Sequence, residues 1–489
     1  MGKCSGSPCD TSQLVASLGY FTIRTSNEIE LIMENAEPKI APLAGANMPA
    51  DRGLSGLGLL MQMSGSVFLA YGAFMVMLPM LSGPGAGDGR MKMLMVALLC
   101  VVRSSFHRAA GSALLYGNPK GPLHQVKVYI GVALAQSAAL FFLLGDIMPT
   151  KMGIYLVAVL VAWPVTLAIV LSQPRFRDLG DSLERAEDMG FESAAVMMTI
   201  FGILGAMTSG LVIVTVYQAP FFSLGDVPSF LWMGVIGMLF FRSVLHARAG
   251  LQGCKGVRAE RASESAARYF NFGIMSAIIA SAILMLQMIM QVGTLHFAIF
   301  ATVGVLGYLL LTWPLLLRNF YTDRNFSILI EDQEVTRRAP DSGLTALGWI
   351  LLGLGSMGLV ANLGTIFLLD GSFQGMDMMM LSSLSDPGAH SAWWSVGLAA
   401  LQTVAGYELV RMSPRHKLMT TIYGGVSVVV TLYLWWPLLK QISEPRFDGP
   451  IGSLQLYGML LISLAVAVSA IFLVNRDSAP DAKARITEE

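Results

Sequence analysis

Charged residues are scarce in this chain of 489 residues. Asp, Glu, Lys and Arg make up 13% of it, against roughly 25% in soluble domains, whereas hydrophobic residues make up 54%. This composition excludes an ordinary globular enzyme, and the high hydrophobicity excludes a disordered chain. The 32 basic residues balance the 32 acidic ones, so the basic excess typical of nucleic-acid-binding proteins is missing. The composition predicts an all-helical, polytopic membrane protein with a lipid bilayer, and no nucleic acid, as its partner.

Signatures of catalysis are also missing. The sequence contains no nucleophile elbow, P-loop or His-Glu-x-x-His pattern. Cys4 and Cys9 lack the two further ligands that a zinc site needs, and the methionine-rich segment 371–390 is better explained as an apolar interfacial loop than as a Cu(I) site. We therefore expect no catalytic residue, no cofactor and no bound metal, and we expect that the protein is not an enzyme.

Long apolar runs recur along most of the chain. A helix needs about 20 mostly apolar residues to cross a bilayer, and the runs are continuous rather than alternating, which favours helices over barrel strands. Twelve runs meet this description, the second being the weakest because Arg103, His107 and Arg108 interrupt it. The predicted spans are 54–82, 91–116, 124–147, 152–173, 192–219, 227–248, 268–291, 294–318, 343–369, 391–412, 417–439 and 451–475.

The basic residues predict how these spans are oriented. With a cytoplasmic N-terminus, only five of the 32 Lys and Arg residues fall on the opposite face, as the preference of basic residues for the cytoplasmic side requires. We expect both termini in the cytoplasm and a bacterial inner membrane as the location. No basic stretch followed by an apolar core opens the chain, so no cleaved signal peptide is expected.

An internal repeat is the most informative pattern in the sequence. An acidic segment and then an Asp-x-Gly step precede a span entrance three times, at Asp51, Asp188 and Asp341. Asp is a favourable helix N-cap at such a position. We divide the chain accordingly into a cytoplasmic arm 1–50, four-helix repeats 51–177, 178–324 and 325–475, and a cytoplasmic tail 476–489. Because four spans return the chain to the same side, the repeats can be related by a pseudo-threefold axis along the membrane normal.

Two local motifs support this division. Arg103 and His107 in the second helix of repeat one match Arg242 and His246 in repeat two, and the third repeat is aligned at Val404-Ala-Gly-Tyr-Glu408. The fourth helix carries Trp163-Pro164 in repeat one and Trp313-Pro314 in repeat two, whereas the third repeat lacks the pair. Each proline is expected to kink its helix.

The Arg/His motif is the best functional candidate, since charge inside a membrane is costly and usually functional. The pathway candidates are Arg103, His107, Arg242, His246, Glu408 and Arg411. In a pseudo-threefold arrangement His107, His246 and Glu408 could converge at the cytoplasmic end on a polar pathway, an anion or a metal ion. Alternatively, the arginines pin loops by pairing with acidic segments. That alternative is favoured.

The acidic segments contain carboxylates at i and i+3, which share a helix face. These loop-pairing candidates are Glu34, Glu37, Glu184, Glu187, Glu331 and Glu334. Such pairs can bind hard cations, but a solvated amphipathic face is the commoner explanation.

Two function classes remain open. The first is a transport or channel-type protein with a polar site at its cytoplasmic side and an unknown substrate. The second is a non-transporting membrane scaffold, or a subunit of a larger complex, that docks cytoplasmic partners. A membrane-embedded enzyme is a third possibility without a visible acid/base pair inside a span.

Overall fold

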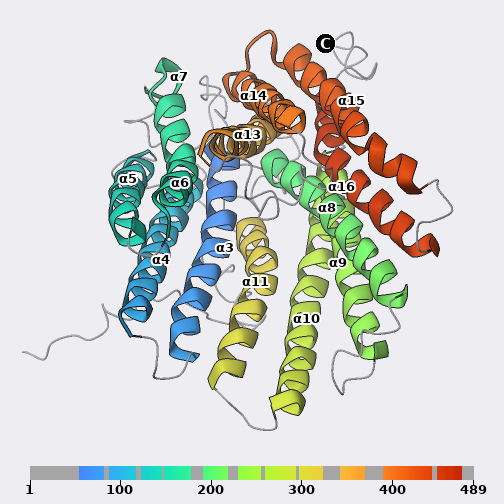
Figure 1. The fold of residues 1–489 in the computed structure, drawn as a ribbon. Helices are drawn as coiled ribbons and strands as arrows, with labels where there is room; N and C mark the ends of the chain where they lie inside the picture. The colour runs from blue at the N-terminus through green and yellow to red at the C-terminus, as the bar shows by residue number, and fades with distance from the viewer. Residues whose placement is uncertain are drawn as a thin grey trace, which may run out of the picture. The chain divides into compact units, whose positions relative to one another are not determined.

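The computed structural model describes residues 54–81, 87–116, 123–145, 148–177, 191–218, 229–254, 259–292, 297–322, 342–368, 389–442 and 449–475. Contacts divide the chain into the units Met1–Met48 and Pro49–Glu489, and every described residue belongs to the second. Within the described ranges the chain forms helices joined by short turns (Figure 1).

Twelve long helices and one short helix make up the described part of the chain. The first group contains α3 (Leu54–Leu81), α4 (Gly87–Tyr116), α5 (His124–Gly145), α6 (Thr150–Leu171) and the four-residue α7 (Pro174–Arg177). The second group contains α8 (Phe191–Gln218), α9 (Ser229–Cys254), α10 (Ala259–Val292) and α11 (Phe297–Thr322). The third group contains α13 (Ser342–Leu368), α14 (Ala389–Arg411), α15 (His416–Ile442) and α16 (Gly449–Asn475). Each predicted span coincides with one long helix.

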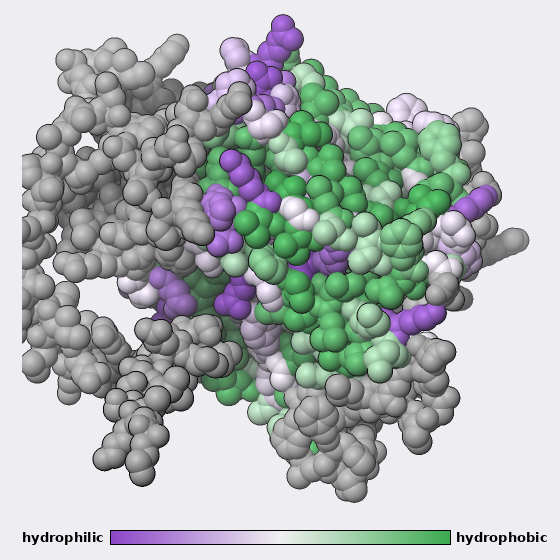
Figure 2. All heavy atoms as spheres, turned by 90° about the vertical axis from the view of Figure 1, so that its left-hand side faces the viewer, coloured by the Kyte–Doolittle hydropathy of each residue, from purple (hydrophilic) through white to green (hydrophobic). Residues whose placement is uncertain are grey.

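Nine of these helices are, over their described residues, long and apolar enough to cross a membrane. They include α4 despite its arginines, whereas α9, α14 and α16 are the long helices outside this set. Figure 2 shows a broad hydrophobic surface with few hydrophilic residues among the described atoms. Exposed apolar side chains on α4 and α5 include Met91, Leu98 and Phe142, which is unfavourable in water but suits lipid. The chain therefore has the helices of an integral, multi-pass membrane protein.

The most extensive helix contacts occur within the pairs α3–α4, α8–α9 and α13–α14. Small residues let the two backbones of each pair approach closely. In each pair a glycine of the second helix lies where an added Cβ atom would overlap a backbone nitrogen of the first helix: Gly111 at Gln62, Gly250 at Thr199 and Gly406 at Leu352. Each pair has a second contact of this kind, in which a Cβ atom added to a glycine of the first helix would overlap a backbone nitrogen of the second helix. These contacts are Gly65 at Arg108, Gly202 at Ala247 and Gly355 at Thr403.

Contacts between the three groups form a closed series. The fourth helix of one group packs against the first helix of another, as α6 on α13, α11 on α3 and α16 on α8. The first helices α3, α8 and α13 also contact one another. Where they meet, a Cβ atom added to Gly56 would lie 2.9 Å from Ala346 and 3.3 Å from the Ser193 hydroxyl oxygen. Leu59, Met197 and Leu347, one from each of these helices, belong to the same buried core.

Candidate functional site

The first polar cluster contains Arg103 and His107 and lies inside the first group of helices. Arg103 on α4 donates through Nη2 to the Leu160 carbonyl oxygen of α6 at 2.5 Å and through Nη1 to the Ser137 hydroxyl of α5 at 3.4 Å. Thus the guanidinium connects α4 to both α5 and α6.

His107 is one helical turn further along α4 and is almost fully buried. Its Nε2 atom lies 3.0 Å from the Ser64 hydroxyl oxygen of α3, and Tyr129 packs edge-on against its ring at 4.6 Å. The Ser64 hydroxyl oxygen also lies 2.6 Å from the Leu60 carbonyl oxygen. Ser64 is therefore placed between an acceptor on its own helix and the imidazole of His107.

The second cluster repeats this arrangement in the second group of helices. Arg242 on α9 donates through Nη2 to the Leu310 carbonyl oxygen of α11 at 2.7 Å. Its Nη1 atom is buried without a hydrogen-bond partner. Both arginines therefore reach a backbone carbonyl of the fourth helix in their group.

His246 differs from His107 in its hydrogen bonding. The Trp313 indole N–H donates to Nε2 of His246 at 2.8 Å, and Tyr269 stacks on the imidazole at 4.3 Å. Because an indole N–H can only donate, Nε2 of His246 must carry a lone pair, so this imidazole is neutral. The same ring nitrogen thus faces different partners in the two clusters, the Ser64 hydroxyl at His107 and the Trp313 indole at His246.

The structure does not bring His107 and His246 together. His107 contacts residues of α3 and α5, whereas His246 contacts residues of α10 and α11. The helices at the contact between the three groups are α3, α8 and α13, and not the helices that carry the two histidines. The two sites are therefore separate.

Glu408 belongs to a helix end rather than to a third cluster of this kind. Its carboxylate accepts a hydrogen bond from the Ser413 hydroxyl, and its carbonyl oxygen accepts from the Ser413 backbone N–H at 3.1 Å. Met412, between α14 and Ser413, has a φ of 49°, and its N–H bonds to the Leu409 carbonyl oxygen at 3.0 Å. These bonds form a Schellman motif that ends α14.

The glycine contacts also give a different register for the third group. Gln62, Thr199 and Leu352 each stand eleven residues after Asp51, Asp188 and Asp341, and they face Gly111, Gly250 and Gly406. Arg103 and His107 stand eight and four residues before Gly111. The residues at the same distances before Gly406 are Leu398 and Gln402. The sequence alignment placed Val404 and Glu408 at these positions, six residues further along the chain.

Arg411 forms a contact of its own. Its guanidinium lies 5.3 Å from the centre of the Tyr407 ring and donates to the Tyr407 hydroxyl at 3.3 Å. Gln173, which follows α6, donates to the same hydroxyl at 2.8 Å. Tyr407 therefore joins the end of α6 to α14.

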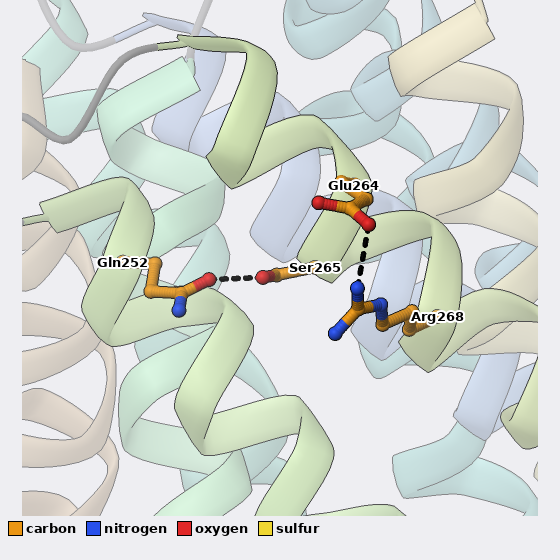
Figure 3. A network of polar contacts seen from close by, with 4 residues as sticks. All are labelled: Gln252, Glu264, Ser265 and Arg268. Atoms are coloured by element: carbon orange, nitrogen blue, oxygen red, sulfur yellow. Dashed lines mark hydrogen bonds and ion pairs between the residues drawn. The ribbon is translucent and has the colours of Figure 1, made fainter.

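A smaller polar network joins α9 to α10 (Figure 3). Gln252 and Ser265 point toward each other from the two helices, and the Ser265 hydroxyl donates to the Gln252 side-chain oxygen. Arg268 pairs with Glu264 on the same helix at 2.5 Å. Both members of this ion pair are largely exposed, so the pair adds little stability.

The remaining sequence candidates lie outside the described residues. These are the six loop-pairing carboxylates, the cysteines Cys4 and Cys9 and the methionines of segment 371–390. Among the described residues, no group of three or more His, Cys, Asp or Glu side chains could hold a metal ion. Sequence reasoning missed the roles of Tyr129, Tyr269 and Ser64.

Comparison with protein-family models, curated proteins and solved structures finds no match to the chain. The function is therefore inferred from the geometry of the polar clusters and of the helix contacts.

Proposed function

We propose that this protein is a non-transporting membrane scaffold built from three similar four-helix bundles related by a pseudo-threefold axis along the membrane normal. The bundles are α3–α6, α8–α11 and α13–α16. The closed series of contacts supports this arrangement, because the fourth helix of each bundle packs on the first helix of another. The glycine contacts at matching positions of the three first-and-second helix pairs support it as well.

The observation that carries the scaffold function is the close contact of the three first helices. Gly56, Ser193 and Ala346 each stand five residues after the Asp of an Asp-x-Gly step, and at Gly56 there is no space even for a methyl group. A solute path along the axis would require α3, α8 and α13 to separate at this level. The buried histidines and the half-buried arginines are, in addition, engaged in contacts inside individual bundles.

The charged helix ends indicate the kind of partner. Arg108, Arg248, Arg318, Arg411 and Arg415 are all exposed, and in the proposed orientation they lie near the cytoplasmic surface. The described acids offer little compensation, since Glu264 pairs with Arg268 and Glu408 accepts from Ser413. We therefore propose that the scaffold docks cytoplasmic partner proteins through acidic surfaces.

Two measurements on the full-length protein test this function. In liposomes, the protein should give no flux of ions or small solutes above protein-free vesicles. A solute-specific flux that is lost in His107→Ala/His246→Ala would overturn the scaffold function and support transport instead.

In native membranes, a photo-crosslinker at position 248 should trap one defined partner. The charge reversals Arg108→Glu and Arg411→Glu should abolish this adduct, because they remove its electrostatic complement. The matched control is the neutral pair Val102→Ala and Val404→Ala on the same helices, which should leave the adduct intact. An adduct that is indifferent to charge reversal would contradict docking through acidic surfaces.

A further inference from the structure

The fourth helices of the first two bundles each contain a proline that leaves a carbonyl group without its usual donor; Pro79 of α3 and Pro437 of α15 are further helical prolines. Pro164 lies inside α6 and Pro314 inside α11. In a helix, the N–H of each residue bonds to the carbonyl oxygen four residues earlier, and proline has no N–H. The carbonyl oxygens deprived of that bond are those of Leu160 and Leu310. In a hydrocarbon environment, such a group needs another partner.

The structure provides an arginine for each of these two carbonyl groups. Arg103 donates to the Leu160 oxygen and Arg242 to the Leu310 oxygen, both through Nη2. Leu160 and Leu310 lie four residues before the two prolines. Each arginine therefore bonds to the carbonyl group that proline leaves without its helical donor, and not to a neighbouring backbone atom. This match occurs independently in two bundles.

The third bundle lacks both the arginine and the proline at the corresponding positions. Leu398 stands at the position that corresponds to the two arginines, and α16 contains no proline beyond Pro450 in its first turn. At these matched positions of the second and fourth helices, arginine and proline are thus present together in two bundles and absent together in the third, whose Pro437 lies in its third helix, α15. A role of the arginines in binding a shared ligand does not require this association, whereas a mutual structural dependence does.

Among the residues that the structure describes, no counter-ion accounts for the position of these guanidinium groups. Arg268 pairs with Glu264, whereas no described carboxylate is paired with Arg103 or Arg242. Each guanidinium instead donates to an uncharged acceptor, a backbone carbonyl oxygen.

We propose that Arg103 and Arg242 replace the N–H donors that Pro164 and Pro314 cannot supply. Each arginine and proline form an Arg–Pro clamp, here defined as the pairs Arg103/Pro164 and Arg242/Pro314. The clamp ties the second helix of a bundle to its fourth helix at the proline. In the second bundle it also holds Trp313, the residue before Pro314, where its indole N–H reaches His246. The arginines are therefore positioning residues.

A double-mutant cycle on the full-length protein in lipid nanodiscs tests the clamp. Arg103→Leu should lower the melting temperature by about 5 °C or more, because the Leu160 carbonyl group loses its donor. Pro164→Ala restores an N–H four residues after Leu160, so the double variant should regain most of that loss. The cycle Arg242→Leu/Pro314→Ala should give the same result. Arg248→Leu, at an exposed arginine on the helix that carries Arg242, is the matched control and should change the melting temperature by less than half as much.

The cycle stays decisive if Arg103→Leu fails to fold. The clamp then predicts that Arg103→Leu/Pro164→Ala folds where Arg103→Leu does not. Additive losses in both cycles, or a double variant that fails while Pro164→Ala alone folds, would overturn the proposal. An Arg103→Leu variant as stable as the wild type would overturn it equally.

Discussion

Alanine substitutions at two glycines of α9 should change stability in opposite directions. Gly250 and Gly237 lie on the same helix, but their surroundings differ. A Cβ atom at Gly250 would overlap the backbone nitrogen of Thr199 and approach the carbonyl oxygen of Ala195, whereas nothing lies within 4 Å of a Cβ atom at Gly237. The obstacle at Gly250 is largely backbone, so it moves only if α8 and α9 separate.

The magnitudes follow from two opposing effects. Replacing a helical glycine by alanine reduces the entropy cost of ordering the helix by about 0.5–1 kcal/mol. At Gly237 nothing opposes this gain. At Gly250, forcing a methyl group into a filled space costs roughly 1–3 kcal/mol. We therefore expect Gly237→Ala to stabilise and Gly250→Ala to destabilise. The entropy gain is common to both variants, so the difference between them should equal the overpacking cost of about 1–3 kcal/mol.

Thermal unfolding in lipid nanodiscs, followed by tryptophan fluorescence, measures this difference on the full-length protein. The corresponding pair on α14, Gly406→Ala against Gly397→Ala, repeats the comparison in another bundle, because Gly406 is tightly packed and Gly397 is open. If Gly250→Ala were as stable as Gly237→Ala, the close approach of α8 and α9 would be refuted.

Two further substitutions test single contacts, again by thermal unfolding. Trp313→Phe keeps an aromatic ring but removes the donor to His246, so we expect the free energy of unfolding to fall by about 1 kcal/mol. The control is Trp394→Phe at an exposed tryptophan. Equal effects of the two substitutions would refute the hydrogen bond from the Trp313 indole. Met412→Val places a β-branched residue at a positive φ and should lower the free energy of unfolding by at least about 1–2 kcal/mol. Met412→Gly relieves that strain but loses side-chain packing, and it should be the more stable of the two variants. The reverse order would contradict the Schellman motif at the end of α14.

Much of the fold could be predicted from the sequence because a bilayer demands long apolar helices. The twelve apolar runs coincide with the twelve long helices of the described residues, and nine of these are apolar enough to cross a membrane over those residues. The helix at 91–116 was the weakest prediction because of its arginines, yet it forms α4. Hydrogen bonds explain this outcome, since Arg103 finds acceptors inside the bundle.

The register of the third bundle could not be read from the sequence. The Arg/His motif is missing there, so the alignment relied on Glu408 as the nearest titratable residue. The packing depends instead on small residues such as Gly406, and glycine is too common in this chain to reveal its partner by sequence alone. One usable signal was present: Arg103 and Pro164 have counterparts in the second repeat and neither has one in the third.

The closed series of contacts between bundles has a consequence for the synthesis of the chain. The face of α3 that packs on α11 is made long before α11, and the face of α6 that packs on α13 likewise precedes its partner. Because helices enter the membrane in chain order, the first bundle faces lipid on both flanks until the second and third bundles follow. Ribosome-bound intermediates therefore carry two unfilled helix surfaces, and the last helix, α16, is the one that closes the assembly by packing on α8.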